Sequence, residues 1–192
     1  MGNLLRDRCA AAELASVGQV IEIADKISSF ESLSEIVEAD LAALDADKMP
    51  SGWRESVVSG ELKFGFVEAG GRIPTVSGSA TATVGAVCQR CLEPFQLQLI
   101  IEPQLLLLSA EQVVDGYDEF EVWELDVETI RPQDIVEELL IMALPLSPMH
   151  DNAIDCKAHS SIESDSDERE ELLRPFAALR TQMQQNEKDP QD

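Results

Sequence analysis

The sequence predicts an α+β fold, an antiparallel β-meander sheet with flanking helices, and three observations lead to this prediction. Apolar residues recur at helical spacing near residues 32–44 and again near 132–144. Between these segments the apolar period shortens to two, which is typical of half-buried strands. No internal repeat interrupts this order, so we expect one mixed domain with tails.

The first helix is predicted over residues 32–44. Its apolar face comprises Leu33, Ile36, Val37, Leu41 and Leu44. Ser32 and Glu35 have the spacing of a capping box, which places the start of the helix, and residues 48–52 end it. Residues 1–30 show no clear element, and Cys9 is expected in a mobile tail.

Three strands are predicted next, as a meander. The first has Leu62, Phe64 and Phe66 on one side and turns at Gly70-Gly71. In the second, residues 76–84, small apolar side chains alternate with Ser and Thr, and the third alternates over residues 95–101. The run 105–108 is four leucines without periodicity, so it fits either a strand or a helical turn.

The rest of the chain predicts a loop, a strand, a helix and a tail. Residues 109–121 are acidic and polar and fit an exposed loop, after which residues 120–125 fit a short strand. The second helix begins near Pro132 and ends before Pro145, with Glu137 and Glu138 on its solvated face. We therefore divide the chain into a poorly defined segment 1–30, an α+β domain 31–158 and a mobile acidic tail 159–192 with a short apolar motif.

The net charge of −23 restricts the class of partner. Residues 101–156 hold 14 acidic side chains and one basic side chain, whereas binding to phosphates needs clustered lysine and arginine. The acidity favours a basic protein partner. Alternatively, the negative charge serves only to keep the protein soluble. No apolar stretch is long enough to span a membrane and no signal peptide is evident, so we expect a cytoplasmic protein.

The strongest chemical signal is Cys88-Gln89-Arg90-Cys91, because two thiolates separated by two residues can share one tetrahedral zinc ion. Cys156 follows downstream, with His150 and His159 as possible fourth ligands. Alternatively, the two thiols are merely small half-buried side chains, or they form a redox disulfide. The sequence contains none of the common nucleotide-binding, metalloprotease or hydrolase motifs, so an enzyme is not expected.

Three blocks of sequence carry a further signal: Cys88 through Phe95, the segment from Leu125-Asp126 and Glu138 to Asp151 with Cys156, and Arg174 through Leu179. In this order they resemble the bacterial YceD family. The resemblance implies a non-enzymatic cytoplasmic factor needed for accumulation of large-subunit (23S) ribosomal RNA. It also implies a structural zinc site, and it favours His150 over His159 as a ligand beside the cysteines.

Acidity and this implied role together suggest how the protein acts. We expect it to bind a basic ribosomal protein or another assembly factor, with ribosomal RNA involved only indirectly. The expected contact residues are Asp115, Asp118, Glu119, Glu121, Glu124, Phe176 and Leu179. The alternative is direct binding of ribosomal RNA, or modulation of the enzyme that processes it, through Arg54, Lys63, Arg72 and Arg90.

Overall fold

A six-stranded sheet forms the centre of the fold in a computed structural model that describes residues 3–45, 47–68, 71–109, 112, 116–125, 127–151 and 156. All elements described below belong to the unit Met1–Ala158. The strands of this sheet are β2 (Val20–Lys26), β3 (Val57–Glu68), β4 (Arg72–Val87), β5 (Pro94–Ile101), β6 (Gln104–Ser109) and β7 (Glu121–Leu125). Their order is β2-β3-β4-β6-β7, and β5 also pairs with β4. The predicted α+β fold is confirmed.

The predicted meander corresponds to β3, β4 and β5, which pair antiparallel in sequence order. In β4 the side chains of Val76, Ala80, Ala82 and Val84 are buried, whereas the serines and threonines between them are partly or fully exposed. The alternation in the sequence therefore corresponds to the two faces of the sheet.

The leucine run 105–108, left open by its lack of periodicity, forms most of β6. Leu105 and Leu107 belong to the main hydrophobic core, whereas Leu106 and Leu108 pack with Ile73 in a second cluster on the other face. Burial on both faces explains the uninterrupted leucines. The predicted short strand is β7, but it pairs parallel to β6, so the sheet is mostly rather than entirely antiparallel.

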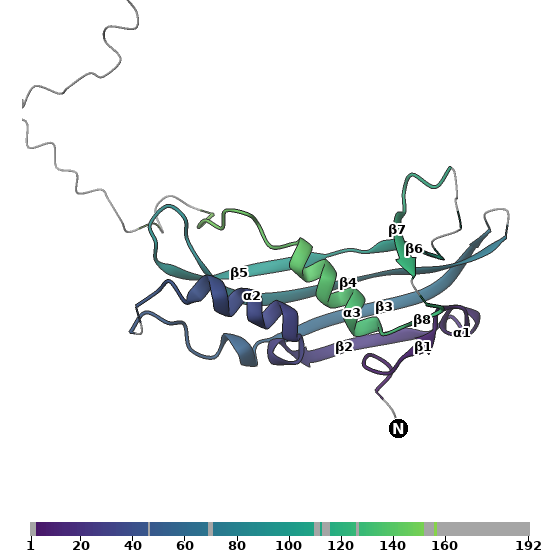
Figure 1. The fold of residues 1–192 in the computed structure, drawn as a ribbon, viewed down its shortest axis with the longest axis horizontal. Helices are drawn as coiled ribbons and strands as arrows, with labels where there is room; N and C mark the ends of the chain where they lie inside the picture. Colours follow the sequence, from purple (N-terminus) through teal and green to yellow (C-terminus); the bar gives the residue numbers. More distant parts are fainter. Residues whose placement is uncertain are drawn as a thin grey trace, which may run out of the picture. The chain divides into compact units, whose positions relative to one another are not determined.

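The two predicted helices are α2 (Glu31–Leu41) and α3 (Pro132–Met142), which lie across the same face of the sheet (Figure 1). Pro132 occupies the first turn of α3, as expected. The predicted capping box at Ser32 is wrong, because the N-cap of α2 is Phe30 and has no side-chain capping bond.

The N-terminus of α2 is instead capped from the other helix. Glu137 Oε1 accepts a hydrogen bond from the backbone N–H of Leu33 at 3.1 Å. Glu138 is exposed, as expected, whereas Glu137 is half-buried and its carboxylate satisfies an N–H group that helix geometry leaves unpaired.

Residues 3–30, for which the pattern predicts no element, contain β1 (Cys9–Ala10), α1 (Ala11–Ser16), β2 and the short 3₁₀ helix η1 (Ile27–Ser29). Cys9 does not lie in a mobile tail, because β1 pairs with β8 (Thr129–Ile130). A second 3₁₀ helix, η2 (Trp53–Glu55), precedes β3. The expected mobile acidic tail, 159–192, lies outside the described residues.

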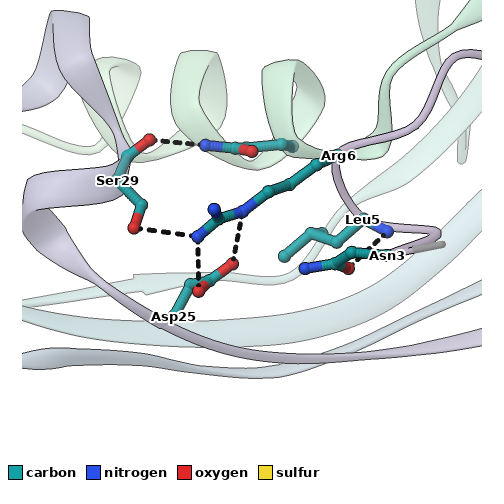
Figure 2. A network of polar contacts seen from close by, with 6 residues as sticks. Asn3, Leu5, Arg6, Asp25 and Ser29 are labelled. Carbon is teal, nitrogen blue, oxygen red and sulfur yellow. Dashed lines mark hydrogen bonds and ion pairs between the residues drawn. The ribbon is translucent and has the colours of Figure 1, made fainter. Parts of the chain in front are cut away.

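The side chains of Arg6, Asp25, Ser29 and Gln133, here called the polar clamp, attach the N-terminal segment to the rest of the fold. Arg6 donates two hydrogen bonds to Asp25, at 3.2 and 2.7 Å, and one to Ser29 Oγ at 3.0 Å (Figure 2). Gln133, on α3, donates from Nε2 to the Ser29 carbonyl at 2.6 Å and from its backbone N–H to the Leu5 carbonyl at 2.8 Å. The polar clamp thus joins the N-terminal segment to η1 and α3.

None of the helices in the described part of the chain is long and apolar enough to cross a membrane.

Candidate metal centre

The first two candidate ligands lie in the turn between β4 and β5. Cys88 directly follows the last residue of β4, and its backbone N–H donates to the Glu93 carbonyl at 3.0 Å. The N–H of Leu92 donates back to the Cys88 carbonyl at 2.8 Å. Leu92 adopts a left-handed conformation with φ of 59°, which lets the chain reverse within these few residues. This tight turn brings Cys88 and Cys91 to one site.

The segment that follows α3 supplies the other two candidates. Gln89 donates its backbone N–H to the Pro148 carbonyl at 2.9 Å, which ties this segment to the turn. The ring of His150 packs against the ring of Phe95, with centroids 4.7 Å apart. These contacts position His150 beside the cysteines, and Cys156 approaches the same place.

Four ligand atoms, from the residues here called the cysteine cluster (Cys88, Cys91, His150 and Cys156), lie within 4.8 Å of one another. Cys88 Sγ and Cys156 Sγ are 3.7 Å apart, and His150 Nδ1 lies 3.6 Å from Cys91 Sγ and 3.3 Å from Cys156 Sγ. A tetrahedral zinc ion keeps two sulfur ligands about 3.8 Å apart, and a sulfur and a nitrogen ligand about 3.6 Å apart. The cysteine cluster can therefore hold a metal ion such as zinc.

The surroundings of the cluster affect its thiols in opposite directions. Burial opposes ionisation of Cys88, but hydrogen bonds from the backbone of His150, Cys91 and Arg90 stabilise its thiolate and lower its pKa to about 5. Burial, together with the sulfurs of Cys88 and Cys91, raises the pKa of Cys156 to about 11. Zinc is ligated by thiolates, and neighbouring thiolates repel one another. A cation between the sulfurs would offset this repulsion and so favour ionisation of Cys156.

The same geometry disfavours a redox role for Cys88 and Cys91. Their side chains are buried, with residue exposures of 0% and 5%, and all four cysteines are free thiols. Thiol–disulfide exchange requires an accessible nucleophilic sulfur, whereas a closed structural metal site requires ligands shielded from solvent.

The remaining predicted site residues are not part of the cysteine cluster. Asp118 and Glu119 precede β7, and Glu121 and Glu124 lie on it; all four side chains are exposed. Asp115, His159, Phe176 and Leu179 lie outside the described residues.

The residues that position the ligands cannot be identified from the sequence pattern. Gln89 and Pro148 act through backbone groups, which carry no signal in the side-chain pattern. Phe95 was placed correctly on a strand, but its contact with His150 joins residues that are far apart in the sequence. Pro145 and Pro148 are the one sequence signal for this arrangement, because they indicate that the chain leaves the helix before it reaches His150.

A comparison with known families gives a match over residues 76–181 with the model described as Large ribosomal RNA subunit accumulation protein YceD. The match covers 106 of the 192 residues and includes the whole cysteine cluster, β7 and α3. No solved structure matches the chain.

Proposed function

The chain belongs to the YceD family, which implies a role in accumulation of large-subunit ribosomal RNA, and we propose that it acts by binding a basic ribosomal protein or assembly factor. In this proposal the protein is a non-enzymatic factor that shields its partner until the partner meets RNA. The observation that carries the proposal is the charge of residues 101–156, with 14 acidic side chains against one basic side chain.

The exposed acids around β7 support this proposal. Asp118, Glu119, Glu121 and Glu124 form no ion pair with any other described residue, so their negative charge faces solvent. A partner rich in lysine and arginine would be attracted to this surface, and the attraction would weaken as salt increases.

Direct binding of RNA is the second candidate, and the positions of the basic side chains disfavour it. Arg54 pairs with Glu38, Lys63 pairs with Glu61 at 2.6 Å, and Arg72 lies 4.0 Å from Glu68 and over the ring of Phe66. Arg90 contacts Met149 rather than an acid. Three of the four candidate bases thus have a carboxylate partner, which leaves little positive charge for phosphates.

Zinc in the cysteine cluster has a structural role in this proposal. The ion would join the turn after β4 to the segment after α3, through Cys88 and Cys91 on one side and His150 and Cys156 on the other. All four tetrahedral positions would be filled by protein, as in structural rather than catalytic zinc sites. We also propose that the folded domain ends at residue 158 and that residues 159–192 form an acidic tail.

The test is a binding titration of the full chain against purified basic proteins of the large ribosomal subunit at low and high salt. The proposal expects micromolar or tighter binding that weakens at least tenfold between 50 and 300 mM salt. Binding that ignores salt, or a shift of large-subunit RNA fragments without any protein binding, would contradict it. In cells lacking the protein, the ratio of large- to small-subunit ribosomal RNA should fall and recover on re-expression.

A further inference from the structure

A groove of about 420 Å³ opens between the C-terminal end of α3, the turn between β5 and β6, and the start of β7. Its apolar surface comes from Ile101, Pro103, Leu139, Met142 and Ala143. Met142 is 65% exposed, which is unusual for a large apolar side chain at the end of a buried helix. The groove therefore offers solvent an apolar floor with a flexible methionine, a side chain that adapts readily to a bound group.

The rim of this groove is negative. Glu102, Glu119 and Glu121 line it, all three are exposed, and none of its lining residues is basic. We call these residues together the acidic groove. Glu102 lies in the β5–β6 turn, Glu119 precedes β7 and Glu121 begins it, so the fold brings separate segments together around the apolar floor.

The end of α3 adds to this negative potential. The carbonyl groups at the C-terminus of a helix carry a partial negative charge that a lysine or arginine in the last turn usually balances. The last turn of α3 has no basic residue, and α3 ends at Met142, in the groove itself. The helix end and the three glutamates thus act on the same small volume, where a cation is favoured.

We propose that the acidic groove binds a short basic segment of a protein partner, in which lysine or arginine side chains pair with the three glutamates and one apolar side chain packs on Met142 and Leu139. This inference rests on the proposed function and locates its contact surface. Charge complementarity selects the occupant: RNA phosphates would meet three carboxylates and a helix C-terminus, whereas a basic peptide meets only opposite charge. The apolar floor selects a segment with an apolar side chain over polylysine.

The test compares two variants of equal net charge. The groove variant carries Glu102→Gln, Glu119→Gln and Glu121→Gln, and the control carries Glu13→Gln, Glu22→Gln and Glu35→Gln, three exposed acids that do not line the groove. The probe is the large-subunit ribosomal protein that binds the wild-type full chain most tightly, titrated at 150 mM salt, where distant charges are largely screened. We expect Kd to increase about tenfold for the groove variant and less than twofold for the control.

The outcomes separate the two proposals. If the wild type binds and both variants weaken equally, the acidic groove is not the contact and this inference is overturned while the proposed function stands. If no large-subunit protein binds the wild type at either salt concentration, the proposed function itself fails. A groove variant that binds as tightly as the wild type overturns the inference as well.

Met142 tests the apolar half of the inference independently of net charge. Met142→Glu adds a negative charge, so purely electrostatic binding would become tighter, whereas loss of the apolar floor makes it weaker. We expect Kd to increase at least threefold. The control Val17→Glu changes another exposed apolar residue, 72% exposed after α1, and should leave Kd within twofold of wild type. Unchanged or tighter binding by Met142→Glu would remove the apolar anchor from the inference.

Discussion

The polar clamp and the cysteine cluster both attach distant segments to the sheet, but they differ in what completes them. In the polar clamp, the positive charge of Arg6 meets the negative charge of Asp25, and Gln133 binds the Ser29 carbonyl. In the cysteine cluster, three sulfurs and an imidazole converge with no cationic side chain among them. The polar clamp is therefore complete within the protein, whereas the cysteine cluster can also hold a metal ion.

This difference suggests that the two attachments respond differently to conditions. The polar clamp holds the N-terminal segment whether or not metal is present. The segment that carries His150 and Cys156 contacts the turn through the hydrogen bond from Gln89 to Pro148, a backbone hydrogen bond from His150 to Cys88, a weak contact between Arg90 and Met149, and the contacts among the ligand atoms. An ion held by the ligand atoms would strengthen this attachment.

Removing the two cysteines of the turn should have the largest effect. Cys88→Ser with Cys91→Ser takes away two of four ligands, so zinc no longer stabilises the folded state. The expected loss is about 4 kcal/mol when free zinc exceeds its Kd a thousandfold. Thermal unfolding with zinc and with a chelator measures it.

Cys9 provides the matched control. Its thiol is half-buried in β1 and lies outside the cysteine cluster, so Cys9→Ser should retain the full response to zinc. If the double variant were stabilised by zinc as much as the wild type, the metal would bind elsewhere.

Gln133→Ala should have the next largest effect and should not depend on metal. Gln133 is only 8% exposed, and without its amide the Ser29 carbonyl loses a partner, which costs about 1–3 kcal/mol. Thermal unfolding should show the same loss with zinc and with a chelator. The control Glu138→Ala changes an exposed side chain on the same helix and should lower the free energy of unfolding much less. A loss that appeared only in zinc would break the contrast between the two attachments.

Metal affinity should depend on pH, with a sign set by Cys156. Because its raised pKa, about 11, keeps Cys156 protonated near neutral pH, metal binding must release that proton. Cys88, with a pKa of about 5, is already ionised there and releases none. Between pH 6 and 8 the affinity should therefore rise at least tenfold per unit, about 1.4 kcal/mol, in competition with a chromophoric chelator. Cys156→Ala should reduce this slope by one proton, and an unchanged slope would contradict the assignment.

The sequence predicts features that are encoded locally. The alternation of apolar and polar residues predicts β4, and the helical spacing of apolar residues predicts α3, because each pattern reflects one buried face. The spacing of Cys88 and Cys91 identifies half of the candidate metal site, because a short turn brings the two thiols together.

Features that depend on distant partners were not predicted. Nothing near Glu137 indicates that its carboxylate caps α2, because the acceptor and the N–H come from residues 104 positions apart. The parallel pairing of β6 with β7 also escaped prediction, since leucines buried on both faces carry no period. Likewise, the acidic groove combines residues of three separate segments that tertiary structure alone assembles.

The smallest predicted effect concerns Leu92, in the turn between β4 and β5. It tests whether this turn forms independently of metal, as the polar clamp does. A left-handed conformation costs a residue with a Cβ about 1–2 kcal/mol, whereas glycine adopts it freely and loses about 0.5–1 kcal/mol in unfolded-chain entropy. Leu92 has φ of 59° and is 64% exposed, so Leu92→Gly relieves the backbone without removing a buried side chain. The net gain should be at most about 1.5 kcal/mol, whereas Leu92→Ala, which keeps the Cβ, should show none.

The dependence of this gain on metal reports how the turn forms. Two backbone hydrogen bonds close the turn without any ligand, from Cys88 to Glu93 and from Leu92 to Cys88. We therefore expect Leu92→Gly to raise the free energy of unfolding equally in zinc and in chelator, measured by denaturant titration. A gain confined to zinc would mean that the turn takes its structure only when an ion binds. The metal-dependent part of the fold would then extend from the end of β4 to the start of β5.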